Sequence, residues 1–225
     1  MVLKQETVDV LNNLASINSN IVINGDGVLR SVNAMKNLMA RAEVPDKFPY
    51  RFGIYDLGEF LSAMGMFDSP ELVFDGASKF VRITDGKQSL RYNFAEPGNL
   101  ITTEKDLVMP SEEVKFIMSA AQLATIRKAS STLKANDLVV TGDDGQLKMT
   151  VTDTKNPSSN EFSIVSETFD IDTDVGFKFV FDIPNFRFVQ SDAYKFTISS
   201  KLLASIEADT VQYWVALKKT STFGA

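Results

Sequence analysis

The two halves of the chain repeat one order of sequence patterns, and this repeat limits the folds open to it. The matched segments are residues 8–14 with 123–129, 21–25 with 138–142, and 55–60 with 181–186. Their offsets grow from 115 to 117 to 126, so the matches are collinear with small insertions. A length of 225 residues suits two domains of about 110 residues each. The sequence therefore predicts similar domains at 1–110 and 111–225, although two unrelated α+β domains could share such a rhythm.

Apolar spacing predicts the elements of each half. Helices are expected at 5–16, 57–66 and 120–134, with a further short helical turn after residue 182. Hairpins are expected at 21–29, around Gly25-Asp26-Gly27, and at 137–153, around residues 142–145. Alternating or continuous apolar runs predict strands at 50–55, 71–74, 79–84, 89–94, 114–118, 177–181, 194–199, 202–208 and 211–217. Residues 95–113 show only weak periodicity of apolar side chains and contain Pro97, Gly98 and Pro110. We interpret them as a connector at the end of the first domain. The pattern indicates an α+β fold, with mostly antiparallel sheets and two helices in each domain.

The chain contains no Cys and no His, which excludes most catalytic chemistry. Thiol nucleophiles, disulfides, Cys/His zinc sites and Ser-His-Asp triads are impossible. An enzyme would depend on carboxylates, Lys, Tyr or Ser. A carboxylate-only enzyme such as a glycoside hydrolase needs two converging acids, and no such pair can be placed from the sequence. We therefore predict no catalytic residues.

Motifs for metals and cofactors are incomplete. Residues 170–174 resemble the start of a calcium loop, but Val175 and Phe181 stand where the EF-hand needs Gly and Glu. Gly25-Asp26-Gly27 lacks the third glycine of a dinucleotide fingerprint, and there is no P-loop motif. We predict no metal and no cofactor. The first residues lack a signal-peptide core, and no apolar run approaches the roughly 18 residues of a membrane span, so we expect a soluble intracellular protein.

Charge is distributed unevenly in an acidic protein. The formal net charge is −6 and the isoelectric point about 4.8, which disfavours wholesale binding to phosphate. Residues 114–136 nevertheless contain no acid and carry Lys115, Arg127, Lys128 and Lys134. A second acid-free window, 27–42, holds Arg30, Lys36 and Arg41. The basic residues of the predicted helix could complement its C-terminal dipole or could face phosphate groups.

Three stretches carry a family resemblance along essentially the whole chain. They are Leu14-Ala15-Ser16-Ile17-Asn18-Ser19, Tyr55-Asp56-Leu57-Gly58-Glu59-Phe60-Leu61, and Val108-Met109-Pro110 at the end of the connector. They are similar to the sliding clamps, or DNA polymerase processivity factors, of T-even-like tailed phages.

This resemblance implies a fold and a function. It implies two domains of the DNA-clamp type in each subunit and a homotrimeric ring. The ring would encircle double-stranded DNA without sequence recognition and bind the C-terminal peptide of a DNA polymerase. An ATP-driven clamp loader would open and close it in the cytoplasm of the infected bacterial host. The clamp itself would not be an enzyme.

The resemblance also gives site hypotheses. Arg127, Lys128 and Lys134 are expected to face DNA, with Lys4 and Arg187 as weaker candidates. The first helix also carries Glu6 and Asp9, so strong attraction of DNA there is in doubt. The expected partner-docking groove consists of Tyr92, Leu107, Val108, Met109, Tyr213 and Val215. For Tyr213 and Val215, plain core packing is the alternative.

A non-catalytic phage structural or virion-assembly protein with duplicated α+β domains stays open as an alternative function. Such a protein would share the composition and the lack of catalytic side chains. It should have no use for a basic helix.

Overall fold

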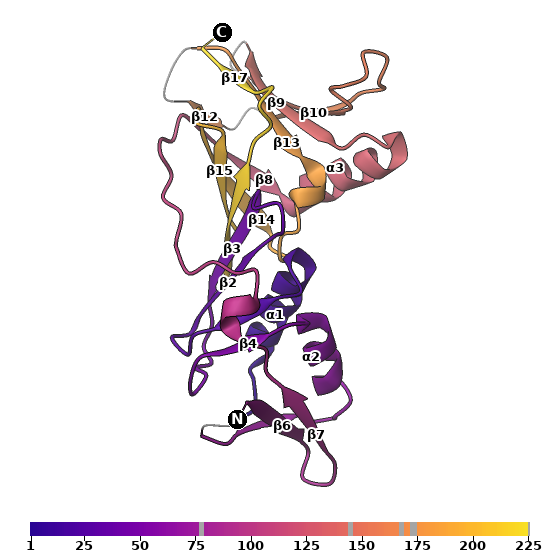
Figure 1. Cartoon of the computed structure of the whole chain (residues 1–225). Coiled ribbons are helices and arrows are strands. Elements are labelled where there is room, and N and C mark those ends of the chain that lie inside the picture. The colour runs from indigo at the N-terminus through magenta and orange to yellow at the C-terminus, as the bar shows by residue number, and fades with distance from the viewer. Residues whose placement is uncertain (77–78, 144–145, 167–168, 172–174, 225) are drawn as a thin grey trace. The chain divides into compact units, whose positions relative to one another are not determined.

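The structure is a computed structural model that describes residues 1–76, 79–143, 146–166, 169–171 and 175–224. The chain forms two compact units, Met1–Asp106 and Leu107–Ala225, each with its own helices and sheets (Figure 1). The described strand pairs within each unit are antiparallel, and the predicted α+β class is confirmed.

The described residues of the first unit pack α-helices beside small β-sheets (Figure 1). Its helices are α1 (Gln5–Ile17), α2 (Leu57–Met64) and the 3-10 turn η1 (Pro97–Asn99). Its strands are β1 (Ile21–Ile23), β2 (Val28–Val32), β3 (Leu38–Glu43), β4 (Phe52–Ile54), β5 (Glu71–Phe74), β6 (Phe80–Thr84) and β7 (Ser89–Asn93). In this unit β1 pairs with β4, β2 with β3, and β6 with both β5 and β7.

The prediction of a hairpin at residues 21–29 is wrong. β1 pairs with β4, and β2 pairs instead with β3, a strand that the sequence analysis did not predict. Gly25 and Gly27 both have positive φ, +82° and +78°, and Gly25 is so close to the Phe48 carbonyl oxygen that a Cβ would lie 2.8 Å from it. The Gly-Asp-Gly segment therefore redirects the chain from one sheet to another, because only glycine adopts this backbone at low cost.

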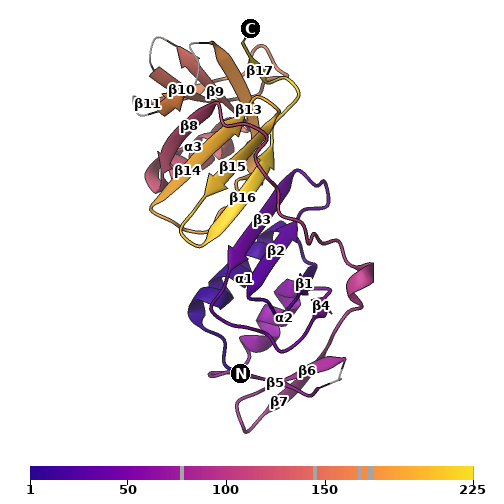
Figure 2. The same ribbon diagram turned by 90° about the vertical axis from the view of Figure 1, so that its left-hand side faces the viewer.

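In its described residues the second unit has the α-helix α3 and two β-sheets (Figure 2). Its first sheet has the order β12-β8-β14-β15-β16, and its second the order β11-β10-β9-β13-β17. The helix α3 (Ala120–Leu133) follows β8 directly, and η2 (Ile183–Asn185) is a 3-10 turn. The strands are β8 (Val114–Ser119), β9 (Asp137–Asp143), β10 (Gln146–Thr152), β11 (Phe162–Ser166), β12 (Phe169–Ile171), β13 (Phe177–Asp182), β14 (Ala193–Ser199), β15 (Leu203–Glu207), β16 (Val211–Ala216) and β17 (Thr222–Phe223).

The hairpin predicted at 137–153 is confirmed as β9 paired with β10. Of its predicted turn, Asp144 and Gly145 lie outside the described residues, as do Asp172, Thr173 and Asp174 of the acidic stretch. Strands β11 and β12 were not predicted.

The second helix expected in this unit is only the three-residue turn η2. In the first unit the side chain of Asp56 caps α2 by accepting a hydrogen bond from the Glu59 amide. The corresponding Asp182 makes no such bond, and its carboxylate lies 3.4 Å from Lys218 Nζ. Without a cap, and with the following Phe186 and Phe188 both buried, the segment does not continue as a helix.

Candidate nucleic-acid interface and docking surface

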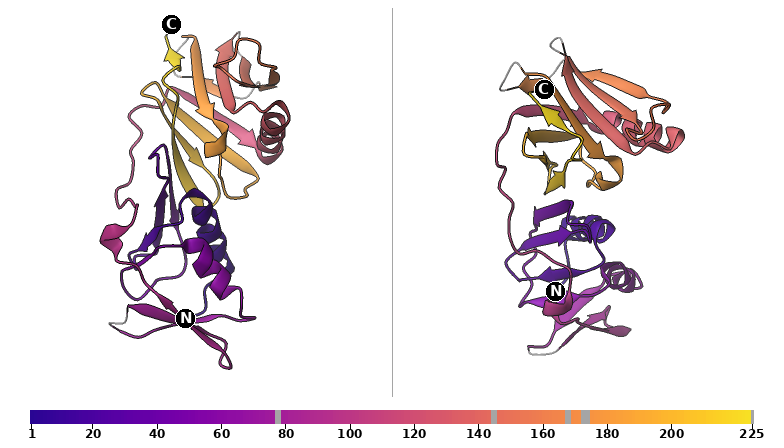
Figure 3. Two further views of the ribbon diagram at one scale, coloured as in Figure 1. Left: turned by 45° about the vertical axis from the view of Figure 1, so that its right-hand side comes forward. Right: turned by 45° about the horizontal axis from the view of Figure 1, so that its top comes forward.

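Helix α3 begins at a complete capping box. The Ser119 side chain accepts from the Gln122 amide at 3.2 Å, and Gln122 Oε1 accepts from the Ser119 amide at 2.9 Å. Leu123 and Ile126 are buried, which fixes the rotation of the helix about its axis. The side chains left exposed are Ala120, Ala121, Ala124, Thr125, Arg127, Lys128, Ser131 and Thr132. The exposed face of α3, which lies alongside the sheets of its unit in Figure 3, is therefore small, polar and basic and contains no acid.

The predicted cations on this helix differ in their bonding. Arg127 donates through Nη2 to the carbonyl oxygen of Phe186, directly after η2, so it also ties the helix to that turn. Arg187 is exposed and donates from Nε to the Pro184 carbonyl at 3.2 Å. The structure thus brings Arg127 and Arg187 to the same turn, a link that sequence spacing could not reveal.

Lys128 and Lys134 have exposed side chains. Lys134 ends α3 in the left-handed conformation, with φ 54° and ψ 36°, and its amide donates to the Ser130 carbonyl. A left-handed residue at this position is a common helix ending, though glycine is the usual choice. Lys134 therefore combines a backbone role with a charge held at the helix end.

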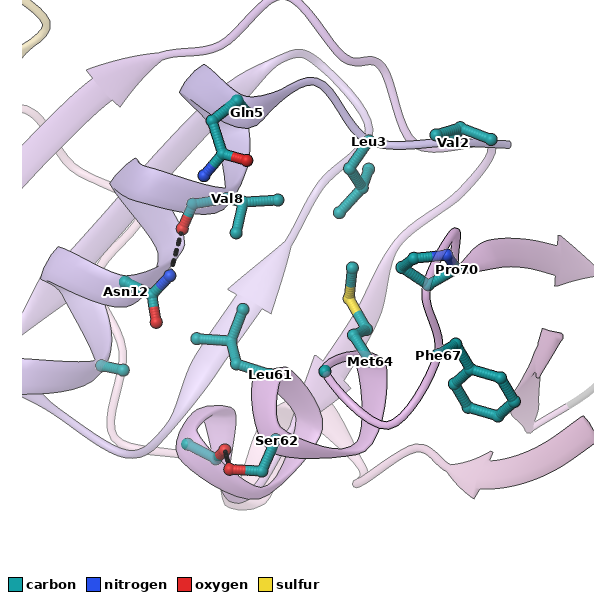
Figure 4. A pocket seen from close by; sticks show the side chains of 13 residues that line it. Val2, Leu3, Gln5, Val8, Asn12, Leu61, Ser62, Met64, Phe67 and Pro70 are labelled. Carbon is teal, nitrogen blue, oxygen red and sulfur yellow. Dashed lines mark hydrogen bonds between the residues drawn. The ribbon is translucent and has the colours of Figure 1, made fainter. Parts of the chain in front are cut away.

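The helices of the first unit present a different surface. Lys4 is exposed just before α1, but the exposed side chains of that helix include Glu6 and Asp9. Between α1 and α2 lies a surface hollow of about 560 Å³, drawn in Figure 4. Its lining is apolar or neutral: Val2, Leu3, Gln5, Val8, Asn12, Ala15, Gly58, Leu61, Ser62, Met64, Gly65, Phe67 and Pro70. Lys4 is thus the only cation among the described residues 4–17.

The connector is held to the first unit by polar contacts as far as Asp106. Asp106 accepts two hydrogen bonds from Arg30, at 2.8 and 3.1 Å, and lies 3.4 Å from Arg41 Nε. Glu104 pairs with Arg51 at 2.5 Å, and the amide of Ile101 donates to Asn20. The hydrogen bond from Arg30 lowers the pKa of Asp106. This anchor was not predicted from the sequence, although Arg30 and Arg41 in the acid-free window were its signal.

Beyond Asp106 the connector presents apolar side chains to solvent. Leu107 is 43% exposed and Val108 85% exposed, and Met109 is half-buried. An apolar side chain as exposed as Val108 contributes little to the core of its own unit, which makes it a candidate for contact with a partner.

The other predicted groove residues are Tyr92 of β7 and Tyr213 and Val215 of β16. Tyr92 belongs to the first unit, where its hydroxyl donates to the Asp56 carbonyl at 3.0 Å and its ring packs edge-on against Phe60. Burial, with the nearby charge of Glu59, raises the pKa of Tyr92 to about 12, so it stays a neutral donor.

Tyr213 and Val215 are both 0% exposed, so their assignment to a docking groove is wrong. The Tyr213 hydroxyl accepts from the Val189 amide at 2.7 Å, and its ring centroid lies 4.8 Å from that of Phe188. These side chains of β16 are core residues of the second unit, because alternate positions of a strand point into the core.

No group of three or more acidic side chains among the described residues is placed to hold a metal ion. Of the helices in that part of the chain, none is long and apolar enough to cross a membrane.

Comparison with known proteins identifies the class. The chain resembles two solved structures. One is PCNA from Thermococcus kodakaraensis, with a TM-score of 0.72 and 11% sequence identity, covering 97% of this chain and 99% of that one. The other is proliferating cellular nuclear antigen from Entamoeba histolytica, with a TM-score of 0.68 and 13% sequence identity, covering 94% of each chain. At these identities the likeness shows the fold, which is that of the DNA clamps.

The sequence comparisons identify the family. Residues 115–219 match the family described as gp45 sliding clamp, C terminal. The sliding clamp of Vibrio phage KVP40 is 32% identical over 222 residues, covering 96% of this chain and 98% of that one. The sliding clamp of Enterobacteria phage T4 is 23% identical over 226 residues, covering 99% of both. The chain belongs to the sliding clamp family of T4-like bacteriophages, as its sequence had indicated.

Proposed function

We propose that this sliding clamp assembles as a homotrimeric ring that encircles duplex DNA and tethers a replicative DNA polymerase for processive synthesis. It has no catalytic role of its own, and an ATP-driven clamp loader places it on DNA in the cytoplasm of the infected host. The observation that carries the proposal is the near full-length similarity to phage sliding clamps. The acid-free basic face of α3 in a chain of net charge −6 supports it.

The chemistry of α3 suits a contact that slides. Phosphate contacts attract DNA without reading its sequence, so they do not fix one register. The exposed alanines and threonines of α3 offer few donors for base edges, whereas Arg127, Lys128 and Lys134 offer positive charge. We assign the DNA contact first to these three residues, and more weakly to Lys4 and Arg187. The acidic remainder of the surface limits binding elsewhere, and screening over about 8–10 Å keeps its repulsion local.

Partner docking is assigned to the exposed part of the connector. Leu107, Val108 and Met109 offer an apolar segment to a peptide such as the C-terminal peptide of the polymerase. The contacts of Asp106 and Glu104 hold the preceding residues against their unit, which lowers the entropy lost when a partner binds.

The first test is the mass in solution by light scattering over a range of concentrations. A species of about 75 kDa, three times the chain mass of 24.9 kDa, is expected. A dimer or a persistent monomer would contradict the ring.

The second test is processive synthesis on primed circular DNA with polymerase and clamp loader. Lys128→Glu with Lys134→Glu should shorten products at moderate salt, by about tenfold, while far-UV circular dichroism stays unchanged. The matched control is Lys195→Glu, which reverses an exposed lysine on β14 of the same unit. Equal product lengths for the double variant and the control would exclude α3 from the DNA contact. Loading of the clamp onto DNA without ATP would contradict the proposal of an ATP-driven clamp loader.

A further inference from the structure

The hairpin of β14 and β15 holds the last residues of the connector within the second unit. Ser200, in the turn of this hairpin, donates twice to the Glu113 carboxylate: from its hydroxyl to Oε1 at 2.6 Å and from its amide to Oε2 at 2.9 Å. The Glu113 amide donates to the Ile198 carbonyl at 3.0 Å, which extends the pairing of β8 with β14 by one residue. Both the side chain and the backbone of Glu113 are therefore fixed to this hairpin.

A second contact lies two residues earlier in the chain. The hydroxyl oxygens of Ser111 and Ser199 are 2.6 Å apart, and Ser199 Oγ also accepts from the Lys201 amide at 3.0 Å. Ser199 is 0% exposed, so its hydroxyl proton needs an acceptor within the protein, and Ser111 Oγ provides one. The side chain of Ser111 in turn hydrogen-bonds to Glu113. We call the four residues Ser111, Glu113, Ser199 and Ser200 the clasp.

The Glu113 carboxylate holds its charge within the clasp. Burial alone would raise its pKa, but hydrogen bonds from the hydroxyl and amide of Ser200, and from the Ser111 side chain, lower the pKa overall. Hydrogen bonds to a charged group are stronger than those between neutral groups. The neighbouring Glu112 differs, because it pairs with Lys115 at 2.8 Å where both side chains are half-exposed. Glu113 and Glu112 are thus adjacent acids, one inside the clasp and one outside it.

The turn that carries the clasp contains a residue in an unusual conformation. Leu202 has a φ of +65°, in the left-handed region that favours glycine. Its amide donates to the Ser199 carbonyl at 3.1 Å, which closes the turn, and its carbonyl accepts from the Leu217 amide at 2.9 Å. A backbone conformation that costs free energy persists where the surrounding contacts outweigh it. The hydrogen bonds of the clasp are part of those contacts.

The clasp begins directly after the apolar docking segment, residues 107–110. The contacts of Asp106 with Arg30 and Arg41 end directly before that segment. Val108, which is 85% exposed, therefore lies on a short segment with an anchor on each side of it in the sequence. Anchors at both ends reduce the number of conformations open to the segment, so less entropy is lost when a peptide binds.

We propose that Glu113 and Ser200 are positioning residues for partner docking, because their hydrogen bonds hold residues 107–110 in the conformation that binds the peptide. The proposal rests on the docking surface of the proposed function. Neither residue is assigned a contact with the peptide, and both act through the conformation of the segment. Loss of the clasp leaves the apolar side chains of the segment unchanged but lets the segment move, so peptide binding weakens while the fold persists.

The first measurement follows the motion of the segment. Because the chain contains no Cys, Val108→Cys introduces a single site for a nitroxide label at an exposed position. The electron paramagnetic resonance lines of the label should narrow when Ser200→Ala or Glu113→Gln is added. They should keep their original width with the matched control Glu112→Gln. Ser200→Thr retains the hydroxyl and the amide, so it should also keep the original width.

The second measurement is the binding of a fluorescent polymerase C-terminal peptide to the unlabelled full chain, followed by anisotropy. Ser200→Ala and Glu113→Gln should each bind the peptide about fivefold more weakly than wild type, as expected for the loss of one or two hydrogen bonds. Glu112→Gln and Ser200→Thr should bind it as wild type does. Ser200→Ala keeps the Glu113 charge and the Ser200 amide bond, so it carries the test if Glu113→Gln does not fold. Far-UV circular dichroism should show Ser200→Ala folded at the assay temperature.

The results separate this proposal from the docking surface on which it rests. An unchanged label spectrum in Ser200→Ala, or narrowed lines together with wild-type peptide affinity, would overturn the role of the clasp and leave the docking surface standing. An equal loss of affinity in Glu112→Gln would also overturn it, because that acid lies outside the clasp. A wild-type chain that does not bind the peptide would overturn both proposals.

Discussion

The carboxylate of Asp46 accepts the hydroxyl proton of Thr7 at 2.6 Å, across 39 residues of sequence. The same oxygen, Oδ2, accepts from the Lys4 amide at 2.8 Å. Lys4 is the N-cap residue of α1 and its side chain makes no capping hydrogen bond, so Asp46 accepts from the Lys4 amide as the N3 side chain of a capping box normally does. Asp46 is 9% exposed and Thr7 0% exposed, which makes this a buried contact.

Asp46→Ala should therefore destabilise the first unit by about 1–2 kcal/mol, because the Lys4 amide and the Thr7 hydroxyl lose their acceptor. Urea unfolding, with hydrogen exchange of the α1 amides, measures the effect. Asp68→Ala, at an exposed acid of the same unit, is the control and should change stability by less than about 0.5 kcal/mol. Equal exchange in both variants would show that Asp46 does not hold the start of α1.

Asp106→Ala should release the connector from the first unit without unfolding it. The contacts of Asp106 with Arg30 and Arg41 are half-exposed, so the expected loss of stability is below about 1 kcal/mol. Trypsin should cleave after Lys105 several-fold faster in the variant.

The pKa of Asp106 predicts how this anchor responds to pH. Because its pKa is lowered, mainly by the hydrogen bond from Arg30, the contact is complete above the unfolded value of about 4 and is lost as the pH falls through the folded value. Hydrogen exchange of residues 101–106 in wild type should thus rise only below about pH 4. Exchange that is equally fast at pH 7 in wild type and variant would contradict the anchor.

Asp137 and Lys218 form the most buried ion pair described in the second unit. Burial alone would raise the pKa of Asp137, but hydrogen bonds from Lys218 and Thr154 outweigh it and lower the pKa. Burial likewise opposes the charge on Lys218, and the contacts with Asp137 and Asp182 raise its pKa overall. The pair therefore stabilises the fold between the titration of the acid below about pH 4 and that of the amine above about pH 10.

Asp137→Asn should lower the free energy of unfolding at pH 7 by about 1–3 kcal/mol, because Lys218 loses its main charged partner. The difference from wild type should shrink towards pH 3 as the wild-type carboxyl is protonated, and also above about pH 10 as Lys218 is deprotonated. Urea unfolding at pH 3, 5, 7 and 11 measures it. A constant difference at all four values would show that the charge of Asp137 is irrelevant.

Substitutions at Val108 and Tyr213 should separate an effect on peptide binding from an effect on the stability of the fold. Tyr213→Ala removes a fully buried ring and the acceptor of the Val189 amide, so it should cost about 3–5 kcal/mol. Val108→Asp changes an 85% exposed side chain and should leave stability within about 0.5 kcal/mol of wild type. Fluorescence anisotropy with a labelled polymerase C-terminal peptide should show at least tenfold weaker binding to Val108→Asp. Unchanged peptide binding would exclude Val108 from the docking surface, and Met109→Asp would then test its neighbour.

The sequence predicted helices well where apolar side chains recur at helical spacing. Leu11 and Leu14 of α1, like Leu123 and Ile126 of α3, lie on one buried face, which their spacing alone indicates. It failed at the Gly-Asp-Gly segment, because a turn signal does not say which strand will be the neighbour. It failed again at residues 183–189, where Asp182 pairs with Lys218 instead of capping a helix.

The sequence by itself determined the chemistry that this protein can use. Without Cys or His it has no thiol or imidazole, and its acid-free stretch ensured that α3 carries only positive charges. Only the tertiary structure decided which side chains are available. Tyr213 and Val108 are both apolar candidates in the sequence, yet one packs into the core and the other lies in solvent. The direct opposition of Arg82 on β6 and Arg91 on β7 likewise depends on strand register, which is set by pairing between distant backbone groups and which no local pattern encodes.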